Sequence, residues 1–297
     1  MSKALDDLMT NLPLWLGKFT QCLTHPSQVL NEHLATGAAP DAGAKADAKA
    51  NDKPEPKPVQ DGASFLILSF AVAAGVAIAF PVASMSPLEA TKAEGALAQS
   101  AAVLRNLFVF LGAAALVHGA AKLLGNRQAF AGFFSAVARF GGATLVLLAL
   151  AGALTNVGMA DPVVARNWQQ LRQVAEQMGQ GAKALLCAAD AKTGQLPPGS
   201  SLPLPSMEQL AQAQALYLDT VSRPLYLVAA GLETACLAAL SLWLGWVWWR
   251  YLRVSGLTPA RALAATAVGA VGLGAGYLLL TLVDSGQMAS QLMQGCP

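Results

Sequence analysis

The chain has 297 residues, of which 55% are hydrophobic and only 12% are charged, and its formal net charge is +2. A soluble domain carries about 25% charged residues, so this composition excludes an ordinary soluble globular protein and favours a membrane protein. The small net charge does not provide the basic footprint that nucleic-acid binding needs, so we expect no nucleic-acid partner.

Residues 1–35 predict short amphipathic helices, because apolar side chains from Leu5 to Leu30 recur at spacings of three and four. Pro13 and Pro26 are expected to separate these helices. Two interpretations are open. The helices pack on the membrane-spanning bundle or on the membrane surface, or one of them binds a partner protein.

Residues 36–61 are low in complexity and consist mainly of Ala, Pro, Lys and Asp. A segment of this composition cannot bury enough apolar surface to offset the entropy lost on ordering. We therefore predict a disordered linker between the N-terminal cytoplasmic segment and the rest of the chain.

Five apolar blocks follow, each about as long as a helix that crosses ~30 Å of hydrocarbon. A helix satisfies its backbone polar groups within its own segment, so we expect transmembrane helices. They are predicted at Ala63–Val82, Leu104–Ala121, Phe140–Val157, Leu225–Trp249 and Ala262–Val283. Residues 62–157 would hold the first three spans, and residues 224–297 would hold the last two with a short tail.

Residues 125–139, between the second and third spans, predict a helix that lies in the membrane interface. Arg127 and Arg139 flank its apolar face. That face consists of Phe130, Phe133, Phe134 and Val137.

Residues 158–223 predict a helical extracytoplasmic loop. Asp161 followed by Pro162 is typical of a helix start, and Ser206 with Gln209 has the spacing of a capping box. The second of these helices could continue directly into the fourth span. The predicted fold class is all-α, a polytopic membrane bundle with amphipathic N-terminal helices and this loop.

The distribution of Lys and Arg predicts the orientation. Basic residues are frequent before the first span, between the second and third spans, and between the fourth and fifth, whereas the tail from Asp284 has none. The positive-inside rule then places the N-terminus in the cytoplasm and the C-terminus in the periplasm. We expect a multi-pass protein of a bacterial inner membrane.

Three segments resemble the Yip1 domain family. Residues 19–30 are similar to an amphipathic segment with a central proline, residues 122–148 to a glycine-then-aromatic stretch, and residues 248–280 to a short turn into the last span. The resemblance implies a cytoplasmic N-terminus and five spans. The eukaryotic members of this family act in membrane trafficking and contact small GTPases and partner membrane proteins. Nothing in this sequence supports a GTPase partner.

Glu233 is the one clear carboxylate deep in an apolar block, about 12 Å from the start of the fourth predicted span at 1.5 Å per residue. A lipid-facing acid costs about 2.5–3.5 kcal/mol, so Glu233 is expected to face the bundle. It could relay protons or bind a ligand, or sit near the interface if the helix starts later. The remaining interpretation is a structural hydrogen bond to a backbone carbonyl or to Thr144, Thr234, Asn106 or His118.

Other candidate residues have structural interpretations. Cys187 and Cys296 would both lie in the periplasm, where a disulfide could join them. His118 is a second intramembrane polar candidate, expected to be packed rather than to act as a ligand. Four glycines have positions that suit close helix packing, Gly141, Gly142, Gly272 and Gly276.

The sequence contains no motif for catalysis, a metal or a cofactor, and we expect none of them. The function we predict is a non-enzymatic membrane scaffold or assembly protein of the Yip1-like type. Its partners would be the lipid bilayer and other membrane proteins or further copies of itself. The alternative is a small transporter or permease subunit that uses Glu233.

Overall fold

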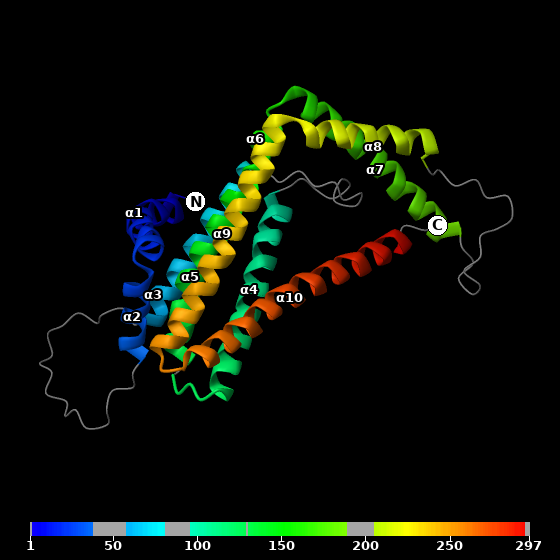
Figure 1. The fold of residues 1–297 in the computed structure, drawn as a ribbon. Helices are drawn as coiled ribbons and strands as arrows, with labels where there is room; N and C mark the ends of the chain where they lie inside the picture. Colours follow the sequence, from blue (N-terminus) through cyan, green and yellow to red (C-terminus); the bar gives the residue numbers. More distant parts are fainter. Residues whose placement is uncertain (1, 38–57, 81–95, 129, 189–204, 295–297) are drawn as a thin grey trace, which may run out of the picture. The chain divides into compact units, whose positions relative to one another are not determined.

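The computed structural model describes residues 2–37, 58–80, 96–128, 130–188 and 205–294 (Figure 1). Within these residues the regular elements are all helices. Their bounds are α1 Ser2–Thr24, α2 Pro26–Gly37, α3 Pro58–Ala79, α4 Ala96–Leu123, α5 Phe130–Ala153, α6 Thr155–Gly158, α7 Pro162–Ala188, α8 Met207–Ser222, α9 Pro224–Val254 and α10 Pro259–Gln294.

Five of the helical segments are long and apolar enough to cross a membrane. They are Gly62–Ala79, Ser100–Leu123, Phe130–Gly158, Pro224–Val254 and Pro259–Val283. Each overlaps one of the predicted apolar blocks, which confirms the all-α polytopic class.

The chain divides into two compact units, and the boundaries between the units fall within the spanning helices. Unit 1 comprises Met1–Gly75, Ala102–Ala149 and Leu237–Gly276. Unit 2 comprises Val76–Ala101, Leu150–Cys236 and Tyr277–Pro297.

α5 is the central helix of unit 1. Every residue of the segment 132–146 except Phe134 is buried, and 56% of the third span is buried, compared with 11% of the fourth and 11% of the fifth. The neighbouring helices approach α5 at its glycines. A Cβ atom on Gly141 would overlap the ring of Phe110 in α4, and one on Gly142 would lie 2.7 Å from Oγ of Ser69 in α3.

The predicted interfacial helix at 125–139 is not a separate element. α5 runs without a break from Phe130 to Ala153, since no proline interrupts this stretch. Two side chains of the aromatic face, Phe133 and Val137, are buried in the core of unit 1, whereas Phe130 is exposed. The third spanning helix therefore begins ten residues before the predicted Phe140.

Prolines and caps account for most of the other helix ends. Pro26 begins α2 as predicted, but Pro13 lies inside α1 and does not divide it. The Asp161 carboxylate accepts the backbone N–H of Val163 (2.8 Å) at the start of α7. α8 begins with the predicted capping box.

α8 does not continue into the fourth span. It ends at Ser222, and Arg223 is extended with φ −69° and ψ 130°. The cause is Pro224, because a residue that precedes proline is disfavoured in the helical region. The predicted linker 36–61 lies mostly outside the described residues, and its described ends belong to α2 and α3.

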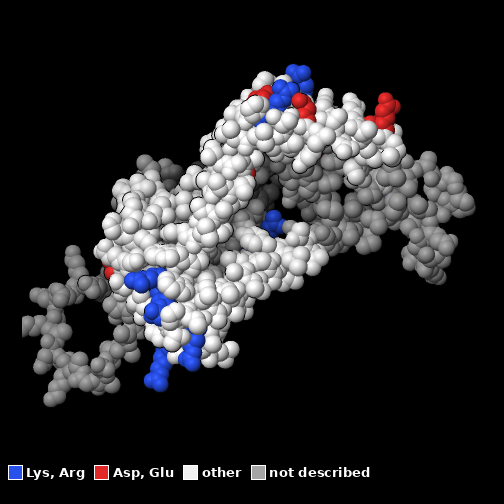
Figure 2. All heavy atoms as spheres, in the orientation of Figure 1, with Lys and Arg blue, Asp and Glu red and all other residues white. Residues whose placement is uncertain are grey.

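Two connections that the sequence assigns to one side of the membrane lie together in unit 1. Nη1 of Arg261 donates to the carbonyl of Leu124 (3.1 Å), and Nδ2 of Asn126 donates to Oγ of Ser255 (3.1 Å). Figure 2 shows Lys and Arg side chains gathered over these connections. We call this the basic end of unit 1, formed by residues 122–128 and 250–261.

The α4–α5 contact makes a stability prediction at Gly141. Gly141→Ala places a methyl group against the buried ring of Phe110, and overpacking of this kind costs about 1–3 kcal/mol. We expect a lower melting temperature in detergent. Gly112→Ala, on α4 with nothing within 4 Å of its Cβ position, is the matched control, and equal melting temperatures for the two variants would contradict the contact.

Candidate functional site

Glu233 lies within α9, and its side chain is partly buried. It shares a helical face with Tyr226 and Ala229, which are seven and four residues earlier. That face packs on the end of the third span, because a Cβ atom on Gly158 would lie 3.2 Å from Cδ2 of Tyr226 and 3.6 Å from Cβ of Ala229. Glu233 is therefore one helical turn beyond this contact.

The carboxylate of Glu233 has no hydrogen bond or ion pair to any of the residues that the structure describes. Two of its predicted partners bond elsewhere. Thr144 donates to the carbonyl of Phe140 (2.8 Å), and Thr234 donates to the carbonyl of Ala230 (2.8 Å). Its predicted roles stay predictions.

His118 lies in an aromatic cluster near the end of α4. Its ring centroid is 5.3 Å from that of Phe130 and 4.8 Å from that of Phe133. Phe133 in turn contacts Tyr251 edge-on, at 5.6 Å. His118 is thus a packed aromatic side chain at the basic end of unit 1.

The remaining predicted residues are two glycines of α10 and two cysteines. A Cβ on Gly272 would lie 2.7 Å from Cδ1 of Leu116, and one on Gly276 would lie 2.8 Å from Cγ1 of Val109, so both glycines lie where α10 crosses α4. Cys187 lies at the end of α7, partly buried, while Cys296 lies outside the described residues. Their disulfide stays a prediction.

The sequence did not reveal how the N-terminal helices dock on the spans. Nε1 of Trp15 in α1 donates to Oγ of Ser69 in α3 (2.9 Å), and both side chains are buried. The Trp15 ring also stacks on the rings of Phe19 and Phe65, with centroid distances of 5.1 and 6.1 Å. Ser69 is seven residues into its span, about 10 Å at 1.5 Å per residue. α1 therefore contacts α3 well inside the spanning region.

The end of α1 and the following helix α2 extend this contact to α5 and α9. Cys22, Val29 and Leu30 are 0–1% exposed and belong to the same buried cluster as Phe133 and Tyr251. We call the surface that receives α1 and α2 the head seat. It consists of the residues that contact Trp15, line a cavity with Leu30 or lie near Cys22, namely Phe65, Ser69, Phe133, Val137, Arg139, Phe140, Tyr251 and Leu252.

The head seat determines the chemistry of Cys22. Burial raises the pKa of its thiol to about 12, the charge of Arg139 opposes the shift, and the charge of Glu32 adds to it. The thiol is therefore protonated and neutral near pH 7, and it is a poor nucleophile because the thiolate is the reactive form.

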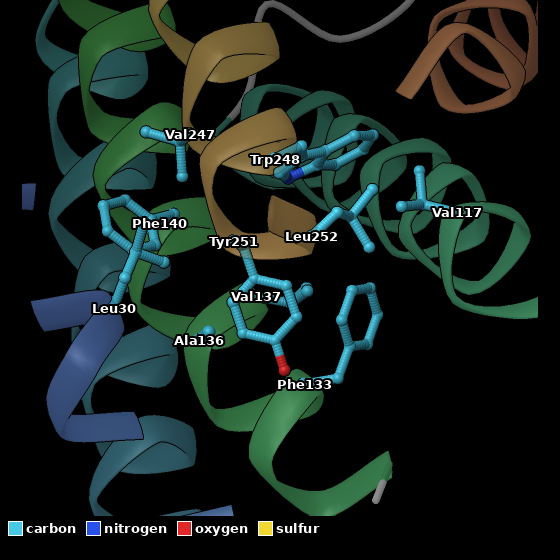
Figure 3. A pocket seen from close by; sticks show the side chains of 10 residues that line it. All are labelled: Leu30, Val117, Phe133, Ala136, Val137, Phe140, Val247, Trp248, Tyr251 and Leu252. Atoms are coloured by element: carbon cyan, nitrogen blue, oxygen red, sulfur yellow. The ribbon is translucent and has the colours of Figure 1, made fainter. Parts of the chain in front are cut away.

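A small cavity of ≈ 10 Å³ lies beneath α2. In Figure 3, Leu30 closes it on the side of α2, Val117 lies on the side of α4, and Trp248 and Tyr251 reach it from α9. A cavity of this size has room for about one water molecule. The head seat is therefore a nearly filled packing surface that receives a helix.

Unit 2 has a polar contact of its own between α7 and α8. The Asp219 carboxylate accepts Nδ2 of Asn167 (2.8 Å) and Nη2 of Arg223 (3.0 Å). The hydrogen bond from Asn167, followed by that from Arg223, lowers the pKa of Asp219. This group holds the helical loop together where it meets the fourth span.

Among the described residues, no group of three His, Cys, Asp or Glu side chains is placed to hold a metal ion. Comparison of the chain with protein-family models, with curated proteins and with solved structures gives no match. The resemblance to the Yip1 domain family therefore stays a prediction.

The head seat makes a labelling prediction for Cys22. Docked helices shield its neutral thiol, so a water-soluble maleimide at pH 8 should modify it slowly. Trp15→Ala removes the side chain that anchors α1, and a large buried truncation costs about 3–5 kcal/mol. We expect the labelling rate of Cys22, followed by mass spectrometry of its peptide, to rise at least about tenfold.

Leu14→Ala is the control, because Leu14 is 61% exposed whereas its neighbour Trp15 is 7% exposed. This variant should label like the parent protein. Fast labelling of Cys22 in the parent protein, or the same rate in both variants, would contradict the docking of α1.

Proposed function

We propose that this chain is a non-catalytic membrane scaffold or assembly protein of the Yip1-like type, which binds other membrane proteins or further copies of itself. One observation carries the proposal. The fourth and fifth spans are only 11% buried within the chain, although the third is 56% buried. These two helices leave most of their surface available to lipid or to another protein.

The exposed surface of α9 suits helix–helix contact. Gly231, Ala235 and Ala239 are exposed and follow one another at intervals of four residues, and a Cβ atom on Gly231 would meet nothing within 4 Å. Small side chains at this spacing allow two helices to approach closely in a membrane. The proposed contact surface for a partner is this face of α9.

The proposed location is a bacterial inner membrane, with the N-terminus in the cytoplasm and the C-terminus in the periplasm. The basic end of unit 1 supports this orientation, since it brings the α4–α5 and α9–α10 connections together. Lys and Arg in short loops favour the cytoplasmic side. The head seat lies partly at this same end, so α1 and α2 would enter the membrane from the cytoplasm.

The second candidate is a small transporter or permease subunit that uses Glu233. Its support is a partly buried carboxylate inside a spanning helix, without a hydrogen-bond partner among the described residues. Intramembrane acids commonly mark ion or proton pathways.

Extraction of the protein from native membranes into lipid nanodiscs tests the proposed scaffold function. We expect a stoichiometric partner protein or a homo-oligomer to copurify. Gly231→Leu should reduce that association at least about tenfold by blocking close approach, while Gly75→Leu on α3, also with nothing within 4 Å, should not. A monomer without partners would contradict the proposal.

Glu233→Gln separates the two candidates. For a scaffold, the variant keeps both its fold and its partner, because the amide has almost the same shape as the carboxyl group. Proton-coupled flux in proteoliposomes that disappears in Glu233→Gln would instead establish the transporter.

A further inference from the structure

α8 has three distinct faces along its length. Ala213, Leu216 and Thr220 form the less exposed face, where α8 packs on α7. Glu208 and Gln212 lie on a second, exposed polar face. The third face is apolar and exposed.

The exposed apolar face of α8 is formed by Met207, Leu210, Tyr217 and Leu218. Met207 is 82% exposed and Leu218 is 56% exposed. At 100° per residue, these side chains fall within one sector of the helix, about 150° from the polar face. Gln214 is the one polar side chain within this sector.

The position of α8 in the chain brings this face to the membrane boundary. A single residue, Arg223, separates α8 from Pro224, which begins both α9 and the fourth span. The last turn of α8 must therefore lie beside the membrane surface. Figure 1 shows α8 turning sideways from the start of α9. The exposed apolar side chains continue in α9 with Leu225, Leu227 and Val228.

We propose that α8 lies in the membrane interface, with its exposed apolar face in contact with the boundary between lipid headgroups and acyl chains. Its apolar row is continuous with the lipid-facing surface of a span. Tyr217 supplies the amphipathic ring that is frequent at this depth. The α7–α8 hairpin is then held on the membrane.

The charge of α8 indicates which lipids it contacts. Residues 207–222 contain no Lys or Arg, and Arg223 is paired with Asp219 (3.0 Å). Attraction to anionic headgroups requires basic residues near the surface. The burial of apolar side chains thus provides the free energy that binds α8 to the membrane interface. Zwitterionic lipid is sufficient for this binding.

Depth-dependent fluorescence quenching tests the proposal. A fluorescent amino acid is placed by codon suppression at position 218, or at position 212 as the matched control, in the full chain in phosphatidylcholine nanodiscs. Both native side chains are exposed, so the substitutions leave packing intact, and size-exclusion profiles verify this. The quenchers are a nitroxide on the upper acyl chain and aqueous iodide.

We expect the probe at 218 to be quenched by the nitroxide at least about threefold more than the probe at 212, with the reverse order for iodide. Equal access of iodide to both positions would overturn the proposal. Shielding of position 218 from both quenchers would also overturn it, since protein would then cover the face. If quenching of the probe at 218 by the nitroxide required phosphatidylglycerol in the nanodisc, the apolar origin of the contact would be overturned.

Discussion

The hydrogen bond from Trp15 to Ser69, and the burial around it, is the interaction on which unit 1 depends. Within a bilayer no water satisfies polar groups, so an arginine on a spanning helix must be covered by protein, and a serine there bonds to its own helix or to a neighbouring one. Ser69 in α3 and Arg139 in α5 are both buried. The side chains that cover this side of the spans come from α1 and α2. The N-terminal helices therefore complete the bundle.

This docking requires close contacts between the spans beneath it. The same Ser69 that accepts Trp15 lies over Gly142, and Phe110 lies over Gly141. Larger residues there would push α3 and α4 away from α5 and displace the surface that receives α1. The tightly packed third span contrasts with the open fourth and fifth spans. One part of the bundle is thus specified within the chain, while another is left for lipid or for partners.

The spans and the helix starts could be predicted from the sequence because they depend on residues that are close together in the chain. Long apolar runs marked the five spans, and the capping residues Asp161 and Ser206 marked helix starts, because both depend on neighbours in the chain. Periodicity also indicated an amphipathic N-terminus, but it could not show that Trp15 meets Ser69, 54 residues away. The aromatic pattern of residues 130–137 predicts an interfacial helix, because a face that packs on protein has the same pattern as one that packs on lipid. Glu233 was similarly ambiguous, since its surroundings depend on tertiary contacts.

In this structure α1 and α2 are an integral part of the membrane bundle. Hydrogen–deuterium exchange of the full chain in nanodiscs measures this most directly, because exchange reports the free energy of local opening. We expect the amides of residues 14–30 to exchange nearly as slowly as those of α5, and much faster in Trp15→Ala. Rapid exchange of residues 14–30 in the parent protein, at the rate of an isolated surface helix, would contradict it.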